Sequence, residues 1–192
     1  MDEARLLLVL EDAAEEARRR APGAIACAAG CGECCHRMFA ITEADAARLR
    51  RGLESMERTD PARAAGIRER ARAAWDRVKA DFPGDAETGI LKSNEEWRDW
   101  FWARTQGVPC PVQDPESQAC SMYEHRTAAC RLYGPLIRVG EEWSGPCPKC
   151  YAGFERAEME AAAPAIDVDE WGEEGPETTI AAAIALAAKG LE

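Results

Sequence analysis

Cysteine is the residue type that most limits what this chain can fold into. Nine of the 192 residues are cysteines, and they are grouped along the sequence. They are Cys27, Cys31, Cys34, Cys35, Cys110, Cys120, Cys130, Cys147 and Cys150. An odd number of thiols cannot all pair, and the Cα atoms of the adjacent Cys34 and Cys35 lie about 3.8 Å apart, below the range of about 4.4–6.8 Å usual for disulfides. A framework of disulfides is therefore disfavoured.

The N-terminus also argues against disulfides, because it lacks the features of an export signal. Acidic residues appear at once, at Asp2 and Glu3, and the first apolar run ends at Leu10 with further acids after it. A signal peptide would begin with basic residues and continue with a longer apolar segment. We therefore expect a cytoplasmic protein, whose thiols remain reduced and can bind metals.

Two further interpretations of the cysteines are free thiols in a hydrophobic core and metal ligands. Core packing explains one or two of them, but not four within residues 27–35, where two glycines separate them. Thiolates are soft ligands that suit zinc and iron–sulfur clusters. If the turn after Gly30 is helical, Cys31, Cys34 and Cys35 point to one side of it, because they are spaced i, i+3 and i+4. We therefore predict that the nine cysteines are candidate ligands of zinc, iron or an iron–sulfur cluster.

The last two cysteines form a pattern of their own, Cys147-Pro148-Lys149-Cys150. This knuckle could hold a separate ion or complete the site of the first cluster. His36 and His125 are the two histidines, and each is close to a cysteine in the sequence, so either could be a ligand. One tetrahedral zinc needs four ligands, so nine thiols leave room for more than one ion or for a polynuclear centre.

The charge is unevenly distributed. The net charge is −11, and residues 155–192 alone contribute −8, from ten acidic and two basic residues. No basic footprint for nucleic acid is present, and the arginine-rich stretch from Arg48 to Lys79 is interpreted as a solvated helix surface of mixed charge. The longest apolar run, Ile180 to Ala188, has nine residues, too few for a membrane span of about 20. The acidic tail could bind a protein partner.

Helical periodicity is clear in the first part of the chain. Residues 3–20 have apolar residues at helical spacing. Thr42, with Asp45 three residues later, predicts the start of a second helix. Asp60-Pro61 predicts the start of a third helix, because Asp caps and Pro fits the first turn; the apolar spacing continues to about Asp81.

Later segments give weaker signals. Ser93 and Glu96 form a potential capping box for a short fourth helix. The segment from Arg131 to Trp143 predicts a short hairpin that turns at Gly140, and a last alanine-rich helix is expected over 177–189. We therefore expect a mainly α fold: a small helical domain over 1–154, with an irregular Cys-rich metal-binding core and one short β-hairpin, followed by an acidic Ala/Glu-rich extension over 155–192.

A set of short motifs resembles the YkgJ-like cysteine-cluster family, described as a zinc- or iron-chelating domain of CxxCxxCC type. The motifs are Cys31-Gly32-Glu33-Cys34-Cys35, Ile41-Thr42-Glu43, Gly107-Val108-Pro109-Cys110-Pro111, Ala119-Cys120-Ser121-Met122-Tyr123-Glu124-His125-Arg126 and Ala129-Cys130-Arg131-Leu132-Tyr133. The resemblance covers roughly residues 24–150 and implies metal ligands among Cys27, Cys31, Cys34, Cys35, Cys110, Cys120 and Cys130. Tyr123 and Arg126 belong to its second block. The chain departs from the pattern with three residues between Cys27 and Cys31 and with Thr127 where Pro is common.

An enzymatic alternative uses the same cluster. The flagellin lysine methylases carry a similar cluster, which suggests an iron–sulfur redox or group-transfer enzyme, methyltransferase-like, with a pocket lined by Trp97, Trp100 and Tyr123. The spacing Cys27-x3-Cys31-x2-Cys34 also occurs in radical S-adenosylmethionine enzymes, but the alternating strands and helices of their barrel are missing. No Gly-rich strand–helix loop for a methyl donor is evident. The sequence therefore favours a metal-binding module, without choosing between zinc and iron.

Overall fold

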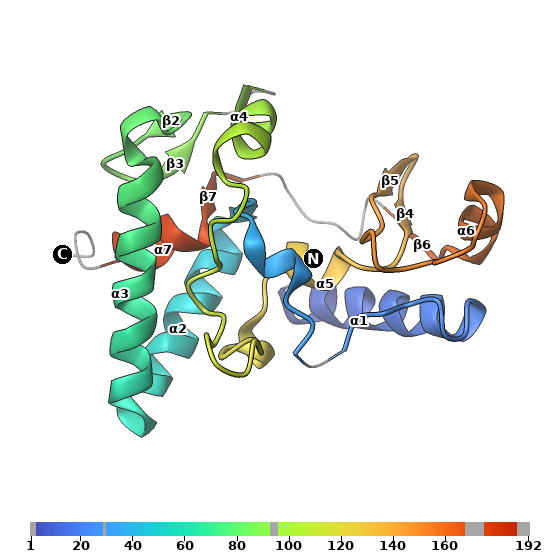
Figure 1. The fold of residues 1–192 in the computed structure, drawn as a ribbon, viewed down its shortest axis with the longest axis horizontal. Helices are drawn as coiled ribbons and strands as arrows, with labels where there is room; N and C mark the ends of the chain where they lie inside the picture. The colour runs from blue at the N-terminus through green and yellow to red at the C-terminus, as the bar shows by residue number, and fades with distance from the viewer. Residues whose placement is uncertain (1–2, 29, 93–95, 168–174, 188–192) are drawn as a thin grey trace. The chain divides into compact units, whose positions relative to one another are not determined.

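The computed structural model describes residues 3–28, 30–92, 96–167 and 175–187 (Figure 1). Its contacts divide the chain into two compact units, each built from two separate segments. Unit 1 comprises Met1–Cys31 and Ala128–Glu174, and unit 2 comprises Gly32–Thr127 and Gly175–Glu192. The described residues form seven α-helices, three short 3-10 helices and a few short strands, so the expected mainly α class is confirmed.

Unit 1 combines three helices with one small sheet. Its elements are α1 (Glu3–Arg20), α5 (Ala128–Leu132), β4 (Ile137–Val139), β5 (Glu142–Ser144), α6 (Arg156–Ala162) and β6 (Ala165–Ile166). The helix expected over residues 3–20 is confirmed as α1. Its buried face contributes Leu10 and Ala13 to a small cluster with Ile137 and Ile166, because residues three apart lie on one side of a helix.

The predicted hairpin forms, over a shorter range than expected. Strands β4 and β5 are antiparallel, and Arg138 is paired with Trp143. The turn contains Gly140, whose φ of +60° is a left-handed conformation that glycine adopts without strain. Arg131 and Leu132, at the start of the predicted range, belong instead to α5. Strand β6 adds to β4 in parallel and completes a three-stranded sheet.

Unit 2 is built around two long helices. Its elements are η1 (Glu33–His36), β1 (Ala40–Thr42), α2 (Glu43–Thr59), α3 (Pro61–Val78), η2 (Lys79–Asp81), β2 (Gly84–Asp85), β3 (Ile90–Leu91), α4 (Glu96–Arg104), η3 (Tyr123–His125), β7 (Glu177–Thr179) and α7 (Ile180–Ala185). Both predicted N-caps are confirmed. Asp45 N donates to Thr42 Oγ1 at 3.2 Å, and Arg63 N donates to Asp60 Oδ1 at 3.1 Å. The sequence therefore determines where α2 and α3 begin.

The core of unit 2 is aromatic. Trp75, Phe82 and Phe101 are buried in one cluster, and Trp100 packs edge-on against Phe82 and Phe101. Edge-to-face ring pairs add to the stabilisation that comes from burying the ring surface. The predicted capping box of Ser93 and Glu96 lies outside the residues whose side chains are described. Helix α4 itself is present, and its Trp100 belongs to this core.

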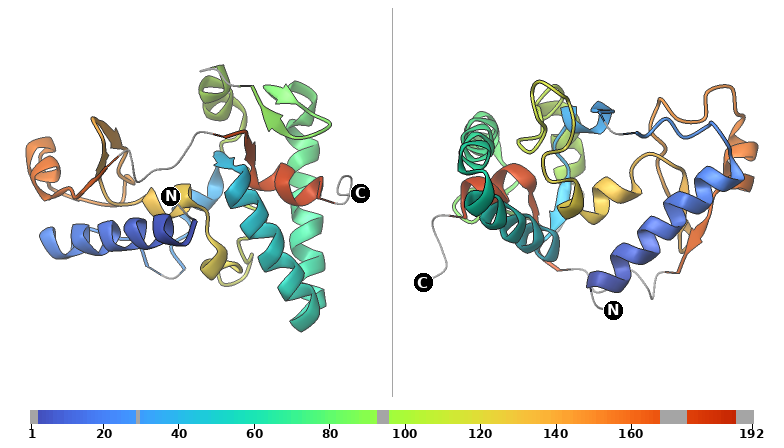
Figure 2. Two further views of the ribbon diagram at one scale, coloured as in Figure 1. Left: turned by 180° about the vertical axis from the view of Figure 1, so that it is seen from behind. Right: turned by 90° about the horizontal axis from the view of Figure 1, so that it is seen from below.

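The helix predicted over 177–189 is shorter than expected: α7 covers Ile180–Ala185, and Leu186 and Ala187 already lie beyond its end. Residues Glu177–Thr179 form β7, which pairs with β1, and only then does α7 begin, with Thr179 Oγ1 accepting from Ala182 N at 3.1 Å. The alanine-rich composition of this segment gives no sign that its first residues pair with β1. Ile184 of α7 is 1% exposed, and α7 packs against α2 and α3, as the rear view in Figure 2 shows. This part of the acidic tail is therefore core of unit 2.

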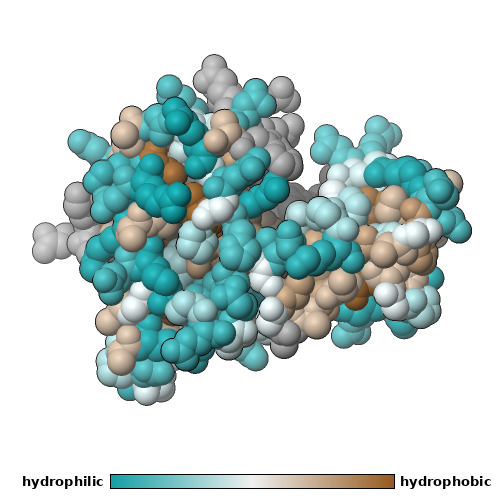
Figure 3. All heavy atoms as spheres, in the orientation of Figure 1, coloured by the Kyte–Doolittle hydropathy of each residue, from teal (hydrophilic) through white to brown (hydrophobic). Residues whose placement is uncertain are grey.

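The arginine-rich helices present a surface of mixed charge, as interpreted from the sequence. Arg68 pairs with Glu57 at 2.6 Å, Arg50 pairs with Glu43 at 2.8 Å, and these pairs are at least partly exposed. Hydrophilic side chains are spread over the face of unit 2 drawn in Figure 3. Among the residues described, no helix has both the length and the apolar character needed to cross a membrane.

Candidate metal centre

The structure distributes the nine cysteines over both units, and none of them forms a disulfide. In unit 1, Cys27 has three neighbouring thiols. We call these four cysteines the unit 1 thiol group: Cys27, Cys31, Cys147 and Cys150. In unit 2, neighbouring segments carry the unit 2 thiol group: Cys34, Cys35, Cys110 and Cys120. Cys130 lies in α5 of unit 1 and is partly buried. The four cysteines of residues 27–35 therefore fall into two different groups.

Local backbone structure explains why the motif divides. Cys34 and Cys35 lie in η1, whereas Cys31 precedes that helix and its N–H closes a turn on the carbonyl of Ala28 at 3.0 Å. The helical alignment of Cys31 with Cys34 and Cys35, expected if the turn after Gly30 were helical, therefore does not form. Gly30 has a φ of +81°, so the chain reverses there in a conformation that a side chain would disfavour.

The unit 1 thiol group joins residues far apart in the sequence. Cys27 Sγ and Cys150 Sγ are 4.0 Å apart. Cys150 N donates to the carbonyl of Cys147 at 2.9 Å, which closes the knuckle predicted from the sequence. Cys147 N donates to the carbonyl of Gly134 at 3.0 Å, and Tyr151 N donates to the carbonyl of Ala24 at 2.7 Å. These backbone bonds hold the knuckle against the segment that carries Cys27.

Gly134 is a site residue that the sequence did not reveal. Its φ is +134°, and a Cβ built on it would lie 2.5 Å from Cys27 Sγ. Only glycine lets the backbone approach this sulfur so closely. A glycine just after the Cys130-Arg131-Leu132-Tyr133 block is the signal that could have suggested a close approach.

The environment of Cys27 is apolar and crowded with sulfur. Burial, and then the nearby thiols of Cys150, Cys147 and Cys31, raise the pKa of Cys27 to about 12. Without an ion this thiol therefore remains protonated at neutral pH. A cation among the four sulfurs would remove the cause of the shift, because it favours the thiolate form.

The unit 2 thiol group is held by hydrogen bonds between three backbone segments. Cys110 N donates to the carbonyl of Cys35 at 2.6 Å, and Gly107 N donates to the carbonyl of His36 at 2.9 Å, so residues 107–110 lie against η1. The segment of Cys120 is joined in turn, because Ser121 N donates to the carbonyl of Val112 at 2.8 Å. The sequence predicted the four cysteines but not how these segments are joined.

The thiols of this second group have contrasting acidities. A hydrogen bond from the Cys35 thiol, helped by a backbone N–H and by the Arg126 guanidinium, outweighs burial and lowers the pKa of Cys34 to about 7. Burial raises the pKa of the Cys120 thiol, although Arg126 opposes this. Cys34 and Cys120 lie close enough to influence each other's charge. Arg126 thus provides positive charge beside both sulfurs.

The other predicted site residues lie around these groups. Arg126 also covers the ring of Tyr123, 3.7 Å from the ring centre, and Tyr123 is exposed. Arg131 is buried in unit 1 and forms an ion pair with Glu11. His36 is exposed, and His125 packs over Gly52 of α2, where a Cβ would come within 2.5 Å of the imidazole. Neither histidine is placed as an evident partner of the thiols.

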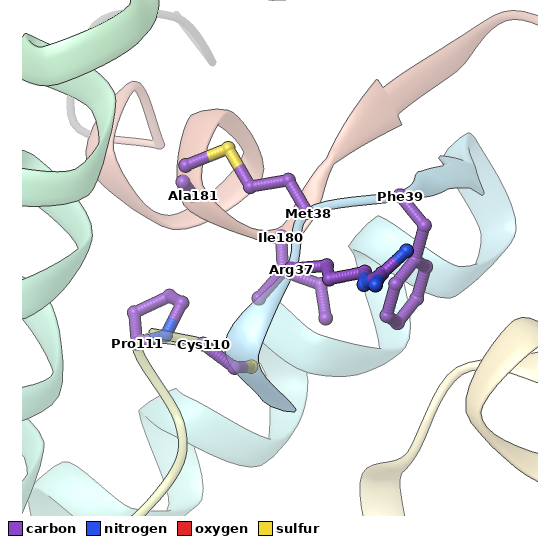
Figure 4. A pocket seen from close by; sticks show the side chains of 7 residues that line it. All are labelled: Arg37, Met38, Phe39, Cys110, Pro111, Ile180 and Ala181. Atoms are coloured by element: carbon purple, nitrogen blue, oxygen red, sulfur yellow. The ribbon is translucent and has the colours of Figure 1, made fainter. Parts of the chain in front are cut away.

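The aromatic pocket of the enzymatic alternative is not assembled as predicted. Trp100 packs in the core, Tyr123 is exposed, and the side chain of Trp97 lies outside those described. A small pocket of unit 2 does contain Cys110, beside the segment that carries Arg37 (Figure 4). Its lining is Arg37, Met38, Phe39, Cys110, Pro111, Ile180 and Ala181, which is mostly apolar.

The thiols are gathered but do not yet converge. Within the described part of the chain, no three His, Cys, Asp or Glu side chains already surround a common point at ligand distances. The expected Cys-rich metal-binding core is therefore not shown among these residues, where the cysteines lie instead in two groups of neighbouring segments.

Comparison with protein families identifies the chain. A family model, CxxCxxCC, described as "Putative zinc- or iron-chelating domain", matches residues 26–151, a range that contains all nine cysteines. No curated protein and no solved structure gives a match. The match spans well over half of the chain and supports metal binding as its role. The chain therefore belongs to the CxxCxxCC family of zinc- or iron-chelating domains.

Proposed function

We propose that the protein binds a zinc or iron ion through the unit 2 thiol group, with Cys34, Cys35 and Cys120 as ligands and Cys110 as the fourth. One observation carries this proposal: η1, residues 107–113 and the segment of Cys120 are linked by backbone hydrogen bonds, and each contributes at least one of these cysteines. Soft thiolates prefer zinc and iron to hard cations. Family membership supports the choice of metals.

The surroundings of these thiols suit a bound cation held by anionic sulfur. Four thiolates around a divalent ion leave a net charge of about −2, which a nearby cation stabilises. Arg126 lies beside Cys34 and Cys120 and supplies that charge. Cys34, Cys35 and Cys120 remain partly exposed, so the ion can be reached from solvent. When bound by all four thiolates, a zinc ion would stabilise the fold, whereas iron would supply redox chemistry.

Metal analysis of anaerobically purified protein tests the proposal. The double variant Cys34→Ser/Cys35→Ser should lose about one equivalent of metal relative to the parent protein. Leu8→Ala is the control, because Leu8 is an exposed side chain of α1, and it should lose none. An unchanged metal content in the double variant would contradict the proposal.

Visible absorption of the same samples decides the form of the metal. Zinc leaves the protein colourless, whereas an iron–sulfur cluster gives charge-transfer bands and acid-labile sulfide. The redox or group-transfer enzyme considered from the sequence requires the coloured form. A colourless, zinc-only protein would exclude that enzyme and leave a metal-binding module.

A further inference from the structure

We propose that unit 1 contains a second, independent metal site, a closed structural zinc centre formed by Cys27, Cys31, Cys147 and Cys150. This site goes beyond the proposed function, which concerns other cysteines in another unit. It would join the segment after α1 to the knuckle near residue 150.

The distance between two sulfurs is the first support. Two thiolates bound to one tetrahedral zinc, each at about 2.3 Å, lie about 3.8 Å apart. Cys27 Sγ and Cys150 Sγ are 4.0 Å apart. A disulfide would need about 2.05 Å. In a [4Fe–4S] cluster each cysteine binds a different iron atom, which places the sulfurs farther from one another. The observed spacing therefore fits two thiolates on one metal atom.

The knuckle itself is the second support. Cys147 and Cys150 are two residues apart, the usual spacing of a zinc knuckle, and the bond from Cys150 N to the carbonyl of Cys147 closes it. Tyr151 follows with a φ of +59°, rare for a residue with a side chain. Its N–H reaches the carbonyl of Ala24, three residues before Cys27. The backbone thus bends to bring both ends of the site together.

Burial is the third support. Cys147 is 3% exposed and Cys150 is 7% exposed. Close approach of Gly134 to Cys27 Sγ shields the same sulfur from another side. Four protein ligands fill a tetrahedral shell and leave no position for a substrate, which is typical of structural rather than catalytic zinc.

The small core of this region explains why an ion is needed. The buried residues of the cluster around the site are Ala21, Ala24, Leu136, Tyr151 and the two knuckle cysteines, of which Leu136 and Tyr151 are large. Ile25 and Met159 pack against this cluster but are only partly buried. Small cores of this kind are usually reinforced by disulfides or metals. An ion that joins two segments from opposite parts of the sequence also restricts the unfolded chain, because it closes a long loop.

A pair of substitutions at one position tests the site. Cys150→Ser should lose about one equivalent of zinc, whereas Cys150→His should retain it, because three thiolates and one imidazole also make a stable zinc shell. Folding damage alone would affect both variants alike. If both keep the full metal content, or if both lose equal amounts, the proposal is wrong.

The backbone contact gives a second test that leaves every thiol in place. Gly134→Ala introduces a Cβ at 2.5 Å from Cys27 Sγ, and it should weaken zinc retention against a competing chelator by at least about tenfold. Gly153→Ala is the control, because Gly153 also has a positive φ, but a Cβ added there would meet no other atom within 4 Å. Equal retention in both variants would overturn the proposal.

The metal content of the variants distinguishes this proposal from the one for unit 2. If only Cys34→Ser/Cys35→Ser loses metal, the unit 2 site stands and the unit 1 site is rejected. If only Cys150→Ser loses metal, the reverse holds. If each variant loses about one equivalent, both sites stand.

Discussion

The two units reach a folded state by different means. Unit 2 has two long capped helices and an aromatic core that includes Trp75, Phe82 and Phe101. Unit 1 has two small clusters, of which the one around Leu136 is mostly alanine and cysteine. Large buried rings supply much of the stability of a domain, and small side chains supply little. The same kind of residue, cysteine, is thus expected to be structural in unit 1 and more accessible in unit 2.

Removal of metal should produce the largest difference in behaviour between the two units. Treatment with a chelator under reducing conditions should expose the amides of Cys147 and Tyr151 to hydrogen exchange at least about tenfold faster, because metal binding and folding are coupled there. Amides within α2 and α3 should change much less. Hydrogen exchange with mass analysis of fragments measures both, and an equal change in the two units would contradict the difference in their cores.

Loss of a core side chain should have the next largest effect, and it tests whether the end of the acidic tail belongs to unit 2. Ile184→Ala should lower the free energy of unfolding by about 2–5 kcal/mol, because Ile184 is 1% exposed. Leu8→Ala, at a side chain 61% exposed, is the control and should change it by less than about 0.5 kcal/mol. Denaturant unfolding measures both. A neutral Ile184→Ala would favour the view of residues 155–192 as a detached arm; a partner for the acidic part of the tail remains a prediction.

The cap of α2 should have a moderate effect. Thr42→Ala removes the oxygen that accepts from Asp45 N and should cost about 1 kcal/mol of stability. Thr42→Ser retains that oxygen and should cost much less. If thermal unfolding shows equal losses, the contribution of Thr42 comes from its place in β1 rather than from the cap.

The smallest effect is a difference in thiol reactivity in the metal-free protein. With a pKa of about 7, Cys34 is about half thiolate at pH 7, whereas Cys27, with a pKa of about 12, is almost wholly protonated. Cys34 should therefore be alkylated first, and the difference should shrink as the pH rises and Cys27 ionises. Peptide mapping after a short reaction with iodoacetamide measures the order. Faster alkylation of Cys27 at pH 7 would contradict the two environments.

Features set by neighbouring residues could be predicted from the sequence. Helix α1, the caps at Thr42 and Asp60 and the turn at Gly140 all depend on contacts within a few residues, and each formed as expected. The match of a family model to residues 26–151 confirmed the resemblance that the cysteine motifs suggested.

Features set by distant contacts could not be predicted. The pairing of β7 with β1 brings together Thr178 and Ile41, and no local pattern indicates it. The division of the cysteines follows the same rule, because Cys27 meets Cys150 only through the folded backbone. Spacing therefore indicated which residues are candidate ligands, and the fold determines which of them lie near one another.

Native mass spectrometry of the intact protein, purified without oxygen and then loaded with zinc, tests the central claim of two separate thiol sites. The account predicts two zinc ions in the parent chain, one in Cys34→Ser/Cys35→Ser and one in Cys150→Ser. A single ion in the parent chain that disappears in both variants would contradict it, because the two groups would then share one site.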